Sequence, residues 1–129
     1  MKATNRLHHS ELTGEIIGAA VDVHQHLGPG QLESAYEECL CRELGLRGVL
    51  FERQKPLPLA YKGIVLECGY RLDLVVESRI IVEIKSVETL SPIYEAQLLI
   101  YIKLARMKVG LLMNFNVPIL KDGIKRFVL

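Results

Sequence analysis

Charged side chains interrupt two otherwise apolar segments in the middle of the chain. Asp73 stands in Leu-Asp-Leu-Val-Val, and Glu83 and Lys85 stand in Ile-Ile-Val-Glu-Ile-Lys. Burying a charge is costly unless it is paired or binds a metal. Two carboxylates at the edge of a core could hold Mg²⁺, which prefers oxygen ligands and often keeps waters and substrate phosphates. The lysine would add a positive charge beside them.

Whether these side chains meet depends on the register of the two strands. Side chains alternate along a strand, so the glutamate and the lysine share a face. Asp73 opposes Glu83 only if Val76 opposes Ile80, which leaves residues 77–79 as a three-residue loop. A plain two-residue turn would put the two carboxylates on opposite faces. We therefore expect a three-residue loop, or a bulge that restores this register. The alternative is a structural salt bridge between the lysine and one of the acids.

Two helical segments add polar side chains that could join the same site. Gln97 and Tyr101 are four residues apart and share one face of a helix that directly follows the Glu83 strand. Glu33 comes just after a Gly-Pro-Gly break, with Tyr36 three residues further on. It could reach a cation from across the sheet, or simply offset the helix macrodipole as a carboxylate at the helix start. The first pair could likewise be only the polar fringe of an amphipathic helix.

The remaining pattern indicates which elements position these residues. Apolar residues at three- and four-residue spacing predict helices, and runs rich in Val, Ile and Leu predict strands. The expected helices are 11–27, 31–44 (stopped by Gly45) and 93–107, and the expected strands are 49–60, 64–76, 80–87, 108–115 and 124–129. Two prolines make 49–60 an edge strand, and 108–115 should be buried on both faces. The order ααβββαββ predicts one α/β domain over 1–129, with residues 1–10 as a flexible N-terminus.

Composition limits the class of protein. The chain has 129 residues, a net charge of +1, and hydrophobic residues at half of its positions, which argues against disorder and against a polybasic binder of nucleic acid. The net charge hides an asymmetry, because residues 11–52 carry −6 and residues 103–129 carry +5. Three cysteines without a CxxC pair favour a reduced chain without zinc. No apolar run suggests a signal peptide or a membrane span, so we expect a cytoplasmic protein.

The ordered set Asp73, Glu83-x-Lys85 and Gln97-xxx-Tyr101, on strand, strand and helix, resembles the PD-(D/E)xK nuclease superfamily. More closely, the chain resembles the small bacterial GxxExxY proteins of that superfamily, whose motif stands here as Gly-Gln-Leu-Glu-Ser-Ala-Tyr over residues 30–36. The segments LGPG, YRLDLVVE, EIKSV, EAQLLIYIKL and VGLLMNF are also similar to family segments. An Arg-Leu pair precedes the aspartate where the superfamily name has a proline.

The resemblance implies a restriction-endonuclease-like core, a mixed β-sheet flanked by helices. It also implies a catalytic set in which two acids coordinate Mg²⁺ or Mn²⁺, joined by a backbone carbonyl and a helix acid, while a lysine positions or activates the attacking water. The metal ligands would be Asp73, Glu83, the Ile84 carbonyl and Glu33, and Lys85 would be the lysine. The residues implied to support the site or contact nucleic acid are Gln97, Tyr101, Tyr36 and Arg71.

These implications favour a Mg²⁺-dependent nuclease that hydrolyses phosphodiester bonds in DNA or RNA, with DNA the preferred expectation. The alternative is a non-catalytic module, for nucleic-acid binding or assembly, that retains the nuclease fold. Phosphate contacts normally dominate affinity for nucleic acid. Since the chain has no separate recognition domain, we expect the basic segment 103–129, a second copy of the chain or a partner protein to supply them.

Overall fold

The structure is a computed structural model that describes residues 9–129. Its main sheet has five strands in the order β1-β4-β5-β6-β7. β5 and β6 pair in parallel, and the other neighbours are antiparallel, so the sheet is mixed as expected. The strands of this sheet are β1 (Phe51–Pro56), β4 (Arg71–Val76), β5 (Ile80–Lys85), β6 (Val109–Asn114) and β7 (Ile124–Val128).

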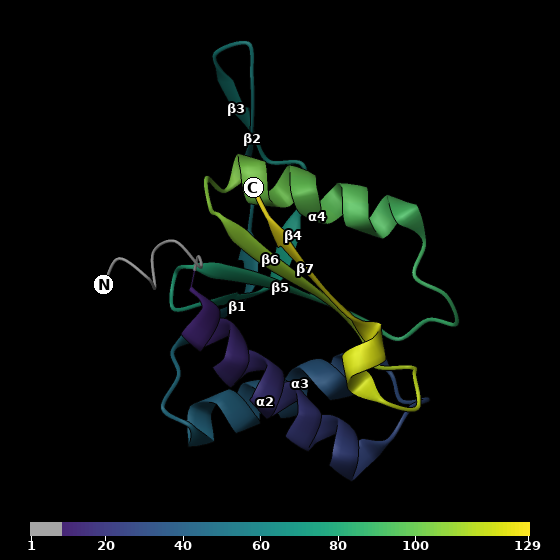
Figure 1. Ribbon diagram of the computed structural model, residues 1–129. Coiled ribbons are helices and arrows are strands. Elements are labelled where there is room, and N and C mark those ends of the chain that lie inside the picture. Colours follow the sequence, from purple (N-terminus) through teal and green to yellow (C-terminus); the bar gives the residue numbers. More distant parts are fainter. Residues whose placement is uncertain (1–8) are drawn as a thin grey trace.

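Helices cover both faces of the sheet (Figure 1). Helices α2 (Ser10–Leu27) and α3 (Glu33–Leu46) lie on one face, and α4 (Pro92–Leu104) lies on the other. Alternation along the strands supplies both layers of the core, since Leu74 and Val82 pack with α2 and α3 while Val75 and Ile81 pack with α4. All six residues of β6 are buried, as predicted for a strand covered on both faces.

The β4–β5 hairpin has the register that the acids require. Val76 pairs with Ile80, and residues 77–79 form the three-residue loop, as predicted. Glu77 and Ser78 have φ angles of 53° and 56°, in the left-handed region that tight turns use. This register brings Asp73 and Glu83 to the same level of the two strands.

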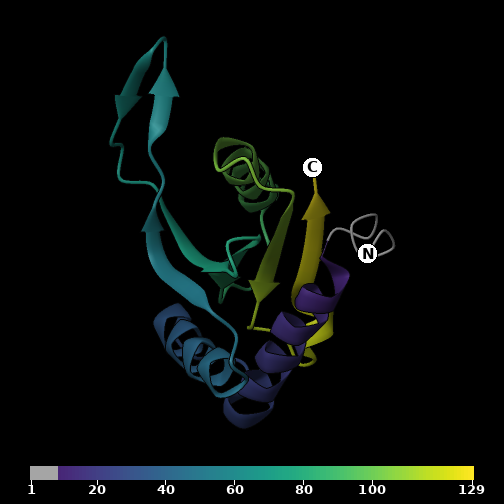
Figure 2. The same cartoon turned by 90° about the vertical axis from the view of Figure 1, so that its left-hand side faces the viewer.

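Two strand predictions were wrong in one respect. The segments 49–60 and 64–76 are not single strands, because each divides into a part in the main sheet and a part outside it. The outer parts, β2 (Leu59–Tyr61) and β3 (Ile64–Leu66), form a separate two-stranded sheet. We call residues 59–66 the hairpin arm, and Figure 2 shows it extending away from the main sheet. Prolines 56 and 58 stand at the break, where they cannot donate to a strand ladder.

Element boundaries differ from the predictions at several other places. The helix expected to stop at Gly45 continues to Leu46, and the helix expected over 93–107 ends at Leu104. The segment expected to be flexible lies outside the described residues except for its last two positions, and Ser10 begins α2. A short 3₁₀ helix, η1 (Leu120–Gly123), occupies the turn before β7. Within residues 9–129 no helix has the length and apolar character needed to cross a membrane.

Candidate active site

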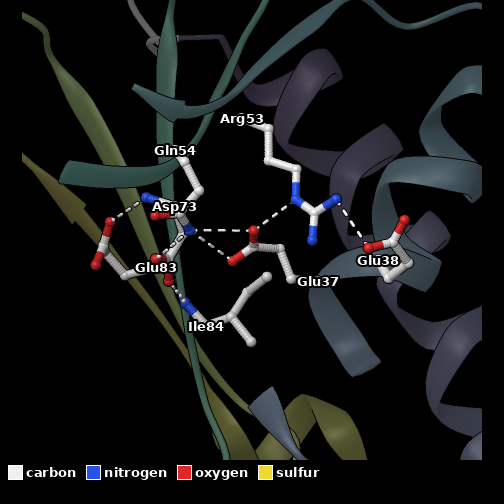
Figure 3. A network of polar contacts seen from close by, with 7 residues as sticks. All are labelled: Glu37, Glu38, Arg53, Gln54, Asp73, Glu83 and Ile84. Carbon is white, nitrogen blue, oxygen red and sulfur yellow. Dashed lines mark hydrogen bonds and ion pairs between the residues drawn. The ribbon is translucent and has the colours of Figure 1, made fainter. Parts of the chain in front are cut away.

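Asp73 and Glu83 meet where the pairing between β4 and β5 ends. The last ladder pair is Leu74 with Val82. Beyond it, the Asp73 amide donates to Glu83 Oε2 at 3.0 Å, and the Ile84 amide donates to Asp73 Oδ2 at 2.8 Å. Each carboxylate therefore accepts a backbone N–H from the opposite strand in place of a ladder bond. Figure 3 shows the two acids and Ile84 together.

The surroundings of this acid pair favour its protonated forms. Glu83 is only 6% exposed, and burial raises its pKa to about 8, with the charge of Asp73 adding to the effect. Burial also raises the pKa of Asp73, although the hydrogen bond from Ile84 opposes the rise. Nearby positive charge would therefore stabilise the charged form of the acid pair.

Lys85 supplies part of that charge from the end of β5. Its charge lowers the pKa of both acids, which places it near them. Its Nζ lies 4.4 Å from the centre of the Tyr94 ring, on α4. A cation over an aromatic face is attracted by the electron-rich ring, so α4 holds the ammonium on the same face of the sheet as the acids.

Glu37, on α3, is an acid that sequence reasoning missed and whose charge acts on both members of the acid pair. Glu37 is 7% exposed, and its charge raises the pKa of Asp73 and of Glu83. Arg53 Nε donates to Glu37 Oε2 at 2.6 Å. A signal for its burial was present, since Glu37 lies at helical spacing from the inward-facing Leu40.

Gln54, which sequence reasoning also missed, joins Glu37 to the acid pair. Its Nε2 lies 3.1 Å from each Glu37 carboxylate oxygen and 3.4 Å from Asp73 Oδ1. Figure 3 shows these contacts between β1, α3 and β4. Nothing in the residue pattern of the edge strand indicates this contact.

Glu33, the expected helix acid, is exposed at the start of α3. Its Oε2 accepts a hydrogen bond from the Ser86 amide at 3.3 Å, immediately after Lys85. The Ser86 hydroxyl donates to the Gln31 carbonyl at 2.7 Å, which ties the start of α3 to the end of β5. Glu33 thus lies at this end of the strand, and its role as a ligand remains a prediction.

Tyr36 holds the loop between the first two helices. Its hydroxyl donates to the Gly28 carbonyl at 2.5 Å and accepts from the Gln31 amide at 3.0 Å. Its ring is buried and stacks on Phe115, with centroids 4.4 Å apart. Through these contacts Tyr36 has a structural role, because it fixes the position at which α3 begins.

The other expected residues lie on α4 and at the start of β4. Tyr101 is 7% exposed, and burial, followed by the charge of Glu83, raises its pKa. Its ring lies 5.9 Å from that of Tyr70, centre to centre. Gln97 and Arg71 are exposed. Tyr101 therefore lies near the acid pair, whereas the other two side chains face solvent.

The acid pair fits a hard divalent cation in its chemistry. Within residues 9–129, no group of three or more His, Cys, Asp or Glu side chains is placed to hold a metal ion. Mg²⁺ commonly binds proteins through one or two carboxylates and completes its shell with water and substrate phosphate. Two carboxylates with raised pKa values would be stabilised in their charged forms by such a cation.

Comparison with known proteins identifies the family. The family model of the PD-(D/E)XK nuclease superfamily matches residues 10–127. No curated protein and no solved structure gives a significant match. Because the match covers nearly the whole chain, this protein belongs to the PD-(D/E)XK nuclease superfamily.

Proposed function

We propose that this member of the PD-(D/E)XK nuclease superfamily is a divalent-metal-dependent nuclease. The observation that carries the proposal is the meeting of Asp73 and Glu83 where β4 and β5 part, with Lys85 beside them. The buried Glu83, the half-buried Asp73 and one lysine constitute the superfamily's nominal catalytic set. The match to the superfamily supports the same activity.

Asp73 and Glu83 would hold Mg²⁺ or Mn²⁺, and the Ile84 carbonyl and Glu33 are further candidate ligands. When bound, the metal lowers the pKa of water and offsets charge on the phosphate. Binding it also relieves the cost of shielding the buried Glu83 and half-buried Asp73 carboxylates from water.

Lys85 would hold a positive charge beside the scissile phosphate and orient the attacking water. The Tyr94 ring keeps its ammonium near the acids, so little reorganisation is needed when substrate arrives. Tyr101 would support the acid pair from α4, while the exposed Gln97 and Arg71 are free to contact the nucleic-acid backbone. Tyr36 would act indirectly, by fixing the start of α3.

We further propose that the chain belongs to the GxxExxY group, on the motif over residues 30–36. We propose DNA in preference to RNA as the substrate, in the cytoplasm. A second copy of the chain or a partner protein would extend the nucleic-acid contacts of so small a domain.

The test is a cleavage assay on single- and double-stranded DNA and RNA, with Mg²⁺, Mn²⁺ or EDTA. We expect metal-dependent cleavage that falls by about 100-fold or more in Asp73→Asn, Glu83→Gln and Lys85→Met. The matched controls are Asp122→Asn and Lys121→Met, exposed positions in η1. They should cleave like the wild type. Cleavage that survives the three site substitutions would contradict the proposal.

A second candidate function is a non-catalytic module for nucleic-acid binding or assembly. The finding in its favour is that, among residues 9–129, no group of three or more His, Cys, Asp or Glu side chains is placed to hold a metal ion. Calorimetric titration with Mn²⁺ separates the two functions. Nucleic-acid binding with neither metal binding nor cleavage would support the module and refute the nuclease.

A further inference from the structure

Gln54 has a backbone conformation that is unusual for its residue type. Its φ angle is 52°, although it lies within β1 between two regular pairs, Arg53 with Leu74 and Lys55 with Leu72. Residues with a Cβ rarely adopt this left-handed region, because the Cβ crowds the following carbonyl oxygen. Strain of this kind persists where the surroundings impose it, often at a functional site.

The strained residue sends its side chain between two carboxylates. Gln54 Nε2 lies 3.1 Å from both oxygens of Glu37 and 3.4 Å from Asp73 Oδ1. Arg53 and Gln54 together give Glu37 donors from two neighbouring residues of the edge strand. The amide is therefore anchored on the α3 side, and its second contact is with the candidate metal ligand.

The opposite oxygen of the Asp73 carboxylate is also fixed. Asp73 Oδ2 accepts the Ile84 amide at 2.8 Å, while Oδ1 faces Gln54. A carboxylate with a donor on each oxygen has a defined plane. Without Gln54, the charge of Glu37 would face Asp73 with no donor between them, and only the Ile84 bond would orient the carboxylate.

We propose that Gln54 is a positioning residue that fixes the Asp73 carboxylate, with Glu37 and Arg53 as its anchor. Groups that orient a metal ligand typically change metal affinity by 10- to 100-fold when removed. The consequence for metal binding rests on the proposed nuclease function, whereas the orientation of Asp73 does not. The strained left-handed conformation of Gln54 is what allows its amide to reach between Glu37 and Asp73.

Two substitutions separate positioning from folding. Gln54→Gly removes the side chain and relieves the left-handed strain, so its melting temperature should equal or exceed that of the wild type. Gln54→Met keeps the length of the side chain and loses the donor. We expect both variants to bind Mn²⁺ about tenfold more weakly in calorimetry. Lys62→Gly is the matched control, because Lys62 has φ 49° in the turn of the hairpin arm, and it should bind Mn²⁺ like the wild type.

A second measurement needs no metal. Amide hydrogen exchange of Ile84 in EDTA reports whether the Asp73 carboxylate stays in place, and the amide of Val82 on the same strand is the internal reference. We expect Ile84 to exchange about tenfold faster relative to Val82 in both Gln54 variants and to be unchanged in Lys62→Gly. Unchanged Ile84 protection would overturn the proposal. If the wild type binds no Mn²⁺, the nuclease function fails, while the exchange result still decides the role of Gln54.

Discussion

Glu83 carries the clearest electrostatic signature in the molecule. Burial and the neighbouring Asp73 raise its pKa from 4.5 to about 8. The folded protein therefore holds this proton more tightly than the unfolded chain does. The stability that comes from the bound proton is fully present below about pH 4.5 and is lost as the pH rises through 8.

We predict that Glu83→Gln stabilises the metal-free protein at alkaline pH. Glutamine keeps an oxygen for the Asp73 amide but has no charge to bury. In EDTA at pH 8.5 the variant should melt at least 3–6 °C higher than the wild type, roughly the shift that 1 kcal/mol produces in a domain of this size. At pH 5 the difference should nearly vanish. Calorimetric melting at both pH values measures it.

The control for that prediction is Asp122→Asn, which neutralises an exposed acid. Its melting temperature should follow that of the wild type at both pH values. A difference between Glu83→Gln and the wild type that is the same at pH 5 and pH 8.5 would show that the protonation state of Glu83 does not change between these values, and the pKa assignment would be wrong.

The site residues differ in how far the sequence could predict them. Asp73, Glu83 and Lys85 stand out because charged residues in apolar strands need a reason to be there. Glu37 was predictable in principle, from helical spacing. Gln54 was not, because its side chain reaches Asp73 only through a left-handed φ, and no local pattern indicates that conformation.

The packing of α4 on the sheet depends on a glycine in β6. A Cβ added at Gly110 would lie 2.7 Å from Ile102 Cδ1 and 2.9 Å from Leu98 Cδ1. We predict that Gly110→Ala destabilises the protein by about 1–3 kcal/mol, because overpacking must shift the helix. Denaturant unfolding measures the change.

The matched substitution is Gly14→Ala on the exposed face of α2, where nothing lies within 4 Å of the added Cβ. It should stabilise the protein by about 0.5–1 kcal/mol, because alanine is the better helix former. If both substitutions had the same sign, the close contact between α4 and β6 would not be the cause.

The hairpin arm contributes little to the stability of the main sheet. None of its six strand residues is buried, whereas Leu57 at its base is 7% exposed and packs under α4. We predict that replacing residues 59–66 with Gly-Asn-Gly lowers the melting temperature by less than about 4 °C, under 1 kcal/mol. Leu57→Ala should cost about 2–5 kcal/mol.

The same replacement should reduce self-association at high concentration, measured by light scattering, because the arm exposes apolar side chains. The exposed fractions are 61% for Ile64 and 68% for Val65. A large loss of stability on removing the arm would contradict its independence from the core.

The arm also shows why some elements could not be predicted. Residues of high β-propensity lie on both sides of Gly69 in 64–76, which favoured one strand, although Gly69 has φ 80° and lies in the gap between β3 and β4. The segment is divided because its two parts pair with different strands. β4 pairs with β5 and β1, while β3 pairs only with β2. The β4–β5 register was predictable because a single constraint, the shared face of two acids, selected the loop length.

Charge is distributed unevenly along the chain. The segment that contains α2 and α3 carries −6, and the segment from 103 to the C-terminus carries +5. Lys103 of the basic segment lies on α4, on the face opposite to α2 and α3, whereas Lys121 lies in η1, which contacts α2. The acid pair is associated with Lys85 and Tyr101 on the α4 side. A polyanion should therefore approach from that side.

We predict that this placement, more than the net charge, governs nucleic-acid binding. Lys103 is exposed on α4. If Lys103→Gln loses a phosphate contact, the logarithm of the association constant should fall less steeply with the logarithm of the salt concentration, the slope becoming less negative by about 0.9. Arg42→Gln removes the same charge from an exposed position of α3, and its slope should equal that of the wild type. Fluorescence anisotropy in EDTA, at 50 to 200 mM salt, measures both without cleavage. If both variants changed the slope equally, net charge alone would drive association. The α4 side would then not be the binding face.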